Sequence, residues 1–316
     1  MRKNNMAIKK VLRKDLTDKL GITERLAGPR CDLAPKSLWK RECEYGTIEK
    51  ISLQMEEDFT NYIYLCLPKD MPAPYRAFIC LQGHSTGMHT SIAVDWHDEV
   101  TPIPVEGDRD FAIGCMKRGI AAICLEQRAM GVHSENVNQE PGCLWPSGLN
   151  TLLHGRTMVG DRVFDVDRVI DYMAERGDFD MTHVGVMGNS GGGTTSIYAG
   201  AALPRLTHVM PSCAFSTYQA SIMSIRHCIC NYIPGLLELG EVADILSLTA
   251  PRNLVLVCGR FDPIFPLADA QKEFERLHAF YEEQGAGGKC HMVIGEGDHR
   301  FYADDAWKVM LPLWQE

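Results

Sequence analysis

Apolar strand-like runs alternate with helical segments along most of this chain, and that alternation restricts the fold more than any other feature. It begins near residue 110 and continues to the C-terminus, with one interruption over residues 214–240. The apolar runs have the length of strands, and the segments between them have helical length and periodicity. Strands joined through helices pair in parallel by right-handed crossovers. The pattern therefore predicts an α/β fold, with a mostly parallel central sheet flanked by helices.

Three more strand-like runs lie before residue 84, separated by polar or proline-containing turns. Local pairing of these runs predicts an antiparallel edge for the sheet, made of IEKISLQME, NYIYLCLP and YRAFICLQG. The residues around 30–41 are expected to be an irregular lead-in. Before them, apolar residues recur at helical spacing in a basic N-terminal stretch. This amphipathic helix is expected to lie on the body of the protein or on a sister subunit.

The expected organisation is a helical extension over residues 1–45, followed by one domain over residues 46–316. Residues 214–240 are rich in Ser, His, Cys, Tyr and Pro, and they are expected to insert a small helical lid. A single large α/β domain can bury a core of this size, so a length of 316 residues does not require a second domain.

The charge balance argues against two classes of partner. With 32 basic and 41 acidic residues the net charge is −9, and this field repels phosphate backbones and anionic lipid headgroups. We therefore expect no nucleic acid and no membrane surface as a partner. No apolar run reaches the ~18 residues that a membrane span needs. The basic N-terminus lacks the features of an export signal, so a cytoplasmic location is expected.

The 12 cysteines are expected to be reduced. Many lie within apolar runs, where a thiol packs as a small hydrophobic group, and a disulfide framework is not expected in a reducing compartment. His227, Cys228 and Cys230 have a spacing that could suggest a metal, but no second ligand pair with zinc-site spacing accompanies them. The prediction is that the protein holds no metal and needs no cofactor.

The strongest local motif is Gly188-Asn189-Ser190-Gly191-Gly192, which directly follows an apolar strand and opens a helix. Such a sharp turn crowds the residues two before and two after its centre, and glycine fits there. The turn would hold the central serine in a strained conformation above the sheet, facing a helix N-terminus. Ser190 is therefore predicted to be a nucleophile. A glycine-rich turn with a capping serine is the alternative; a phosphate-binding loop is disfavoured because its lysine is missing.

A serine nucleophile needs a base and an orienting carboxylate, which are expected after later strands in the order serine, acid, histidine. Asp262 follows the strand-like run LVLVCG, and His299 lies in the loop after the last strand-like run. Asp298 is the competing acid, but it is adjacent to the histidine and would point elsewhere. We predict Asp262 as the acid and His299 as the base.

Acyl transfer to a serine also needs donors for the developing oxyanion. The backbone NH groups of Gly191 and of His84, which follows the run FICLQG, are expected to supply them. Two long loops, over residues 85–108 and 128–154, are expected to border the site, because both follow the carboxyl ends of strands. From these loops and the lid, the predicted substrate-binding residues are Trp96, Trp145 and His227.

Together these motifs resemble the α/β-hydrolase superfamily. The resemblance rests on Gln82-Gly83-His84, the run EQRAMG at 126–131, the GNSGGG turn, and the segments HCICNYIPG, GRFDPIFP and GDHRFY. It covers residues 45–316 and is strongest to the bacterial acetyl xylan esterase-like group related to dienelactone hydrolases. It implies an α/β-hydrolase fold in which Ser190 is the nucleophile, Asp262 the acid and His299 the base.

The chain departs from this group at two positions. Dienelactone hydrolases carry cysteine where this chain has Ser190, which argues against lactone ring opening. Many relatives also begin the oxyanion loop with His-Gly, whereas Gln82 stands here.

The function that the resemblance implies is that of a serine carboxylesterase removing short acyl groups, such as acetyl, from sugars or similar alcohols through an acyl-enzyme. Two alternatives stay open: an amidase or peptidase with the same triad, and a non-catalytic binding protein with this fold. The expected partner is a small-molecule ester. The leaving group, the acyl length and self-association into a homo-oligomer are not determined by the sequence.

Overall fold

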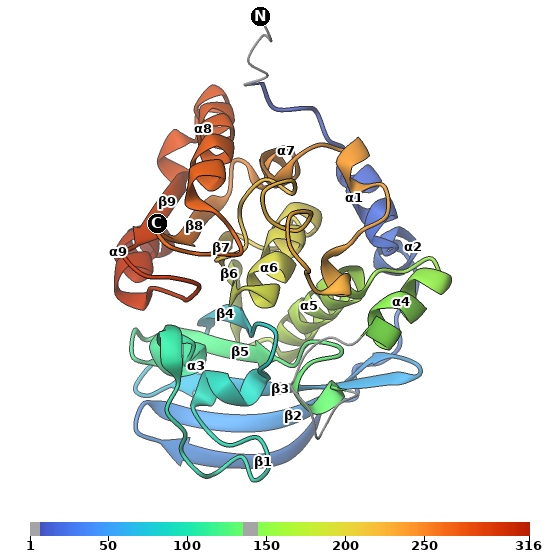
Figure 1. Ribbon diagram of the computed structural model, residues 1–316. Coiled ribbons are helices and arrows are strands. Elements are labelled where there is room, and N and C mark those ends of the chain that lie inside the picture. The colour runs from blue at the N-terminus through green and yellow to red at the C-terminus, as the bar shows by residue number, and fades with distance from the viewer. Residues whose placement is uncertain (1–6, 135–144) are drawn as a thin grey trace, which may run out of the picture.

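A computed structural model describes residues 7–134 and 145–316, and of residues 145 and 146 the backbone only. The described residues form one nine-stranded sheet with the order β1-β2-β3-β5-β4-β6-β7-β8-β9. Its strands are β1 Lys36–Cys43, β2 Gly46–Glu56, β3 Phe59–Pro68, β4 Tyr75–Leu81, β5 Ala121–Leu125, β6 Phe179–Asn189, β7 His208–Ser212, β8 Asn253–Gly259 and β9 Cys290–Gly295. Figure 1 shows β1, β2 and β3 at one end of the molecule and β8 and β9 toward the other.

The sheet is antiparallel at one edge and parallel across the rest. β1, β2, β3 and β5 pair antiparallel in succession, whereas the strands from β4 to β9 pair in parallel. The mostly parallel sheet is thus confirmed, but the assignment of YRAFICLQG to the antiparallel edge is wrong. This run forms β4, which lies between β5 and β6. Residues 77–81 are all buried, and a strand that is apolar on both faces belongs inside a parallel sheet.

β1 corrects the expectation for the segment before the sheet. It pairs with β2 from Lys36 opposite Ser52 to Cys43 opposite Gly46. The irregular lead-in predicted around residues 30–41 is therefore a strand over its second half, and the sheet begins before residue 46, where the domain boundary was placed. The side chains of β1 are mostly exposed, so this edge strand lacks the apolar pattern that identifies an inner strand.

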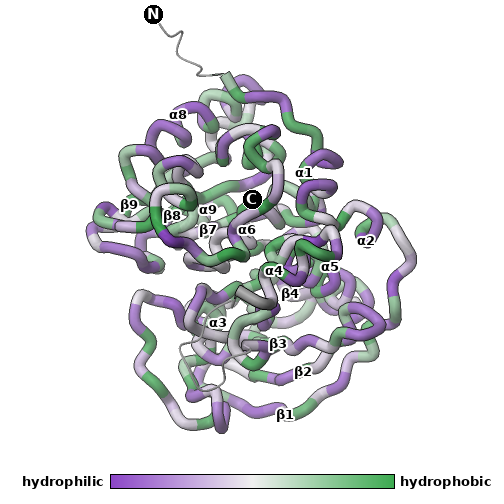
Figure 2. The backbone as a smooth tube through the Cα atoms, turned by 45° about the vertical axis from the view of Figure 1, so that its right-hand side comes forward, coloured by the Kyte–Doolittle hydropathy of each residue, from purple (hydrophilic) through white to green (hydrophobic). Residues whose placement is uncertain are grey.

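Helices cover both faces of the sheet, and alternate residues of the inner strands contribute to two separate cores. On β6, Val184 and Val186 pack under one helical layer and Met187 under the other. One layer contains α1 Arg13–Leu20, α5 Met158–Arg176, α6 Gly191–Ala202, α7 Val242–Leu246 and α8 Leu267–Glu283; the other contains α3 Phe111–Met116 and α9 Ala303–Gln315. Two further short helices are α2 Thr23–Ala27 and α4 Trp145–Leu153. In Figure 2, α8 alternates between hydrophilic and hydrophobic residues, as a helix with one buried face should.

The N-terminal helix lies on the body of the protein. Leu16 and Leu20 of α1 are fully buried, and Figure 1 shows α1 beside α5. The side chain of Arg13 donates to the carbonyl of Ala201 in α6 over 3.0 Å. Thr157, before α5, donates to the carbonyl of Leu20 over 2.9 Å. The helix was expected to lie on the body of the protein or on a sister subunit, and the structure shows it packed on the body. Among the described residues, no helix is both long and apolar enough to cross a bilayer.

The lid segment, residues 214–240, is helical only in two short 3-10 turns, Ile229–Asn231 and Leu236–Glu238. Its serine hydroxyls bond to backbone carbonyls: Ser221 donates to Thr217 over 2.7 Å, and Ser224 to Ala220 over 2.8 Å. Such local bonds compete with longer helices. The segment therefore consists mostly of turns and bends around these two 3-10 turns.

Candidate active site

Ser190 stands at the turn between β6 and α6, and its backbone is strained. Its φ of 55° and ψ of −119° lie in a region that a residue with a side chain rarely adopts. The turn is fixed from both sides, because the NH of Ser190 donates to the carbonyl of Ser212 over 2.9 Å and the NH of Thr194 donates to the carbonyl of Ser190 over 2.8 Å. The predicted strand-turn-helix arrangement around this serine is thus present.

The glycines of the turn are required by close backbone contacts. A Cβ on Gly188 would lie 2.6 Å from the backbone of Gly192, and a Cβ on Gly192 would lie 2.0 Å from the carbonyl oxygen of Leu81. No side chain fits at either distance. These contacts are the physical reason for the glycine spacing seen in the sequence.

His299 and Asp262 form a hydrogen-bonded pair. Nδ1 of His299 lies 2.8 Å from Oδ2 of Asp262, whose side chain is 1% exposed. The second oxygen of Asp262 accepts hydrogen bonds from the NH groups of Ile264 and Phe265, over 2.8 and 3.1 Å. Burial alone would raise the pKa of Asp262, but the bond and charge of His299 and the two NH groups hold this pKa below its ordinary value. The carboxylate is therefore kept ionised beside the imidazole.

The loop that carries His299 is fastened to the strand that supports Ser190. The hydroxyl of Ser212 and the thiol of Cys213 both donate to the carbonyl of Arg300, over 3.2 and 3.1 Å. Nε2 of His299 is buried and has no hydrogen-bond partner among the described residues. It is the ring nitrogen that does not face Asp262, and so the one left to exchange a proton with a nucleophile.

The backbone around residues 83 and 84 lies beside the turn. A Cβ on Gly83 would come within 3.1 Å of the Cβ of Ser190. A Cβ on Gly191 would lie 2.8 Å from the ring of His84 and 3.0 Å from Met130. The two segments predicted to supply oxyanion donors therefore meet at Ser190, and the imidazole of His84 covers Gly191.

Two residues directly after β5 support these loops, and sequence reasoning gave them no role. Burial raises the pKa of Glu126 to about 7, and its carboxyl accepts the NH groups of Met88 and Val132 over 3.1 and 3.2 Å. Gln127 donates to the carbonyl of Gln82 and accepts the hydroxyl of Thr195 over 2.7 Å. The position of Glu126 and Gln127 could have indicated this role, because polar side chains directly after a buried strand lie at the ligand-binding edge of such a sheet.

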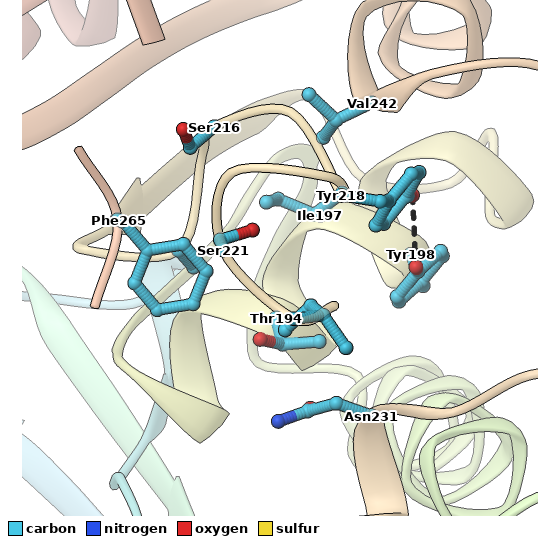
Figure 3. Close-up of a pocket in the computed structure, with 11 residues that line it drawn as sticks. Thr194, Ile197, Tyr198, Ser216, Tyr218, Ser221, Asn231, Val242 and Phe265 are labelled. Atoms are coloured by element: carbon cyan, nitrogen blue, oxygen red, sulfur yellow. Dashed lines mark hydrogen bonds between the residues drawn. The ribbon is translucent and has the colours of Figure 1, made fainter. Parts of the chain in front are cut away.

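A small cavity lies between the first turns of α6 and the lid. Figure 3 shows Thr194, Ile197 and Tyr198 of α6 facing lid residues, with the hydroxyls of Tyr198 and Tyr218 joined by a 3.0 Å hydrogen bond. The cavity volume is about 10 Å³, roughly the space for one water molecule. Phe265, whose ring is stacked at 6.0 Å from the ring of His299, lines the cavity on the side that faces His299.

The predicted substrate-binding residues are placed unequally. The ring of His227 lies 6.4 Å from that of His84 and 6.0 Å from that of Phe265, and burial together with the charge of His84 lowers its pKa. The structure thus brings His227 to the site. The ring contact described for Trp96 is with its neighbour His97, at 3.9 Å, and no described contact joins Trp96 to the triad residues. Trp145 begins α4, and its side chain lies outside the described residues.

Three metal-ligating side chains gather next to this site. Nε2 of His84 lies 3.0 Å from Sγ of Cys230, and that sulfur lies 3.1 Å from Sγ of Cys228. A second such group consists of Cys213, Asp262 and His299. The sequence placed Cys228 and Cys230 near His227, whereas the fold brings in a histidine from the loop after β4. The described cysteines form no disulfide.

Comparison with known proteins gives one curated relative and many structures. No family model matches the chain. YtaP of Bacillus subtilis (strain 168), named provisionally as a hydrolase, is 29% identical over 153 residues, and the match covers 48% of this chain and 51% of that protein. The chain thus matches about half the length of this relative.

Among solved structures, a Bacteroides fragilis protein named provisionally as an acetyl xylan esterase superposes with a TM-score of 0.72 at 15% identity, over 90% of this chain and 74% of that one. A glucuronoyl esterase from Solibacter usitatus gives a TM-score of 0.67 at 15% identity, over 96% and 91%. At this level of identity, the likeness shows a shared fold.

Proposed function

Because the chain has the α/β-hydrolase fold, as the sequence predicted, we propose that it is a serine carboxylesterase with Ser190, Asp262 and His299 as its catalytic triad. The observation that carries the proposal is the buried pair of His299 and Asp262, together with Ser212, whose carbonyl accepts the NH of the strained Ser190 and whose hydroxyl donates to the loop of His299. Acid and base have the geometry that keeps an imidazole in one tautomer, and the serine has the backbone of an exposed nucleophile.

In the proposed mechanism, Nε2 of His299 takes the proton of Ser190 while the serine oxygen attacks the ester carbonyl. The oxyanion is stabilised by the NH groups of Gly191 and His84. His299 then protonates the leaving alcohol, and water repeats the sequence to release the acid. Asp262 stabilises the imidazolium without taking its proton. No step needs a metal or an organic cofactor.

We further propose that the substrates are short acyl esters, acetyl above all, of sugars or oligosaccharides. The lid interleaves apolar side chains such as Phe215 and Ile222 with polar ones such as Ser216, whereas a long acyl chain needs a continuous apolar surface to cover it. The names of the two structural neighbours, an acetyl xylan and a glucuronoyl esterase, favour a carbohydrate ester. Trp96, Trp145 and His227 remain the proposed contacts of the leaving group. Of these three, His227 lies near His84 and Phe265.

A fluorophosphonate probe tests the serine mechanism. We expect one covalent label per chain, located at Ser190 by mass spectrometry, and none on the Ser190→Ala variant. Ser37→Ala, which removes an exposed hydroxyl on β1, is the matched control and should label fully. Folded wild-type protein that stays unlabelled would make the non-catalytic alternative the better one.

Paired substrates separate the esterase from an amidase or peptidase. Nitrophenyl acetate and nitroacetanilide present the same acyl group with different leaving groups, and the esterase proposal expects turnover of the ester only. Equal turnover of the anilide would favour the amidase. A cytoplasmic location also stays a proposal, which fractionation of the native cells would test.

A further inference from the structure

Three side chains with soft donor atoms converge beside Ser190 from two distant parts of the chain. His84 comes from the loop after β4, and Cys228 and Cys230 come from the lid. Their nitrogen and two sulfurs all lie within 4.8 Å of one another. Cys230 is in the middle, 3.0 Å from the nitrogen of His84 and 3.1 Å from the sulfur of Cys228.

These donors match the preferences of a thiophilic divalent cation. Thiolate sulfur and imidazole nitrogen are the usual ligands of Zn²⁺, at about 2.3 Å and about 2.0–2.1 Å. In a tetrahedral site such bond lengths set ligand atoms about 3.5–3.8 Å apart. The two distances from Cys230, 3.0 and 3.1 Å, would have to lengthen by less than about 1 Å to admit the ion, and the nitrogen of His84 and the sulfur of Cys228 already lie within 4.8 Å of each other. Three protein ligands then leave one tetrahedral position for water.

The other candidate sites are less suited. In the group of Cys213, Asp262 and His299, the carboxylate is already bonded to the imidazole and to two backbone NH groups, and the thiol faces the carbonyl of Arg300. A further set of thiols, those of Cys66, Cys80, Cys115 and Cys124, is fully buried in the core under α3. The cluster of His84 with the lid cysteines keeps partial exposure at His84 and Cys228.

His227, which the sequence grouped with the two cysteines, has a different role in the arrangement. Its Nδ1 lies 2.7 Å from the side-chain nitrogen of Asn231 and 3.0 Å from the NH of Cys228. These bonds hold the turn that presents both cysteines on the same side. His227 therefore shapes the cluster, and His84 completes it.

We propose that His84, Cys228 and Cys230 form a binding site for a thiophilic divalent cation, with Zn²⁺ as the physiological candidate, and that the bound ion inhibits hydrolysis at Ser190. The ion would tie the lid to the loop after β4, whose residues 83 and 84 border Ser190, and would thereby close the approach to the serine. The binding step is independent of the proposed esterase function, whereas the inhibition rests on it. This proposal replaces the sequence-based expectation that the protein holds no metal.

Cadmium binding under reducing conditions tests the site directly. The wild-type chain, stripped of metal, is expected to bind one Cd²⁺ with the ultraviolet charge-transfer band of a cadmium thiolate, and Zn²⁺ should displace it. The Cys228→Ser/Cys230→Ser double variant should lose the band and bind Zn²⁺ more than about 100-fold more weakly, since even loss of an outer partner of a metal ligand costs 10–100-fold. Cys31→Ser/Cys43→Ser, which changes two half-buried thiols elsewhere, is the matched control and should bind like the wild type.

The inhibition is measured separately, with the activity of each variant normalised to its own value in chelator. Zn²⁺ should inhibit the wild type and the control reversibly and should spare the double variant. If the double variant fails to fold by circular dichroism, the single variants Cys228→Ser and His84→Asn give the same binding comparison. Absence of the thiolate band in the wild type would overturn the proposal. Cadmium binding that survives in the double variant would also overturn it. Binding that is lost only in Cys213→Ser would do the same, because it would place the ion on the group of Cys213, Asp262 and His299.

Discussion

Oδ2 of Asp262 lies 2.8 Å from Nδ1 of His299, in surroundings that leave the carboxylate 1% exposed and the imidazole 20% exposed. The carboxylate of Asp262 is thus almost fully removed from water, while part of the imidazole ring of His299 stays exposed although its Nε2 is buried. This inequality suits a pair in which one partner only orients and stabilises and the other exchanges protons with substrate and water.

Replacement of the proposed nucleophile should abolish turnover while leaving binding intact. Members of a triad act as a unit, so Ser190→Ala is expected to lower kcat by roughly 10³ to 10⁶ with little change in KM. Steady-state hydrolysis of nitrophenyl acetate by the purified variant measures the effect. Retention of more than about a tenth of the activity would refute the assignment.

Two substitutions test which aspartate is the acid of the proposed triad, Asp262 or Asp298. Asp262→Asn should reduce kcat by about 10⁴, because the imidazole loses the partner that fixes its tautomer. Asp298→Asn is the matched control: Asp298 is exposed, and the carbonyl group, rather than the carboxylate, accepts the hydroxyl of Tyr302. It should retain most of the activity. The reverse order of severity would move the acid to Asp298.

Acyl length is the third prediction. The lid mixes polar with apolar side chains, and each CH₂ of a longer acyl chain gains about 0.8 kcal/mol only where apolar surface covers it. We expect kcat/KM to fall by about tenfold or more from acetyl or propionyl to octanoyl nitrophenyl esters. Stopped assays across this ester series measure the trend, and a maximum at eight carbons would rule out the short-acyl proposal.

Glu126 should make stability depend on pH. Burial raises the pKa of its carboxyl from 4.5 to about 7, so between these values the folded chain binds more protons than the unfolded chain. The free energy of unfolding should therefore fall as pH rises from about 4.5 to about 7, by on the order of 3 kcal/mol, and then level off. Urea denaturation at several pH values should show this decline in the wild type but not in Glu126→Gln. Glu57→Gln, at an exposed position, should follow the wild type, and parallel curves for all three proteins would contradict the prediction.

Arg128 should be one of the most important charges for stability. It makes two hydrogen bonds to the buried Asp165, over 2.6 and 2.8 Å, and an ion pair with Glu56 at 2.7 Å. Arg128→Ala would leave the Asp165 carboxylate buried without its cationic partner, with Asn61 as its remaining donor, and loss of one member of a buried pair costs about 3–5 kcal/mol. Arg176→Ala, which breaks a more exposed pair with Asp178, should cost at most about 1 kcal/mol. Urea denaturation measures the free energy of unfolding of both variants. An equal loss in the two would show that burial does not determine how much each ion pair contributes to stability.

The parts of the fold that depend on local pattern could be predicted, and those that depend on distant contacts could not. The strand before Ser190 and the helix after it were predictable, because apolar periodicity and glycine spacing are local properties. The position of β4 between β5 and β6 was missed, because the strands that pair with it lie far along the chain and local pattern does not identify them. β1 was missed for another reason, because an exposed edge strand has little apolar signal.

The same distinction applies to the candidate site. Asp262 and His299 could be proposed because each lies in the loop after a strand whose end is brought to one edge of the sheet. His84 could not be joined to Cys228 and Cys230, because 144 residues separate it from the nearer cysteine and only the packed lid brings them together. Trp96 was chosen for its place in a long loop, but loop length does not determine the direction in which a side chain points.

The two bonds that Arg300 receives, from Ser212 and Cys213, fasten the loop of the base to the strand that also holds the nucleophile. No described hydrogen bond joins residues 214–240 to the side chains of Ser190, Asp262 or His299. The loop that carries His299 is therefore anchored to the sheet independently of the lid, whereas His84 contacts Cys230 of the lid. A change in the lid should therefore leave the pairing of Asp262 with His299 in place, while it alters the surroundings of His84 and the side of the site that the lid borders.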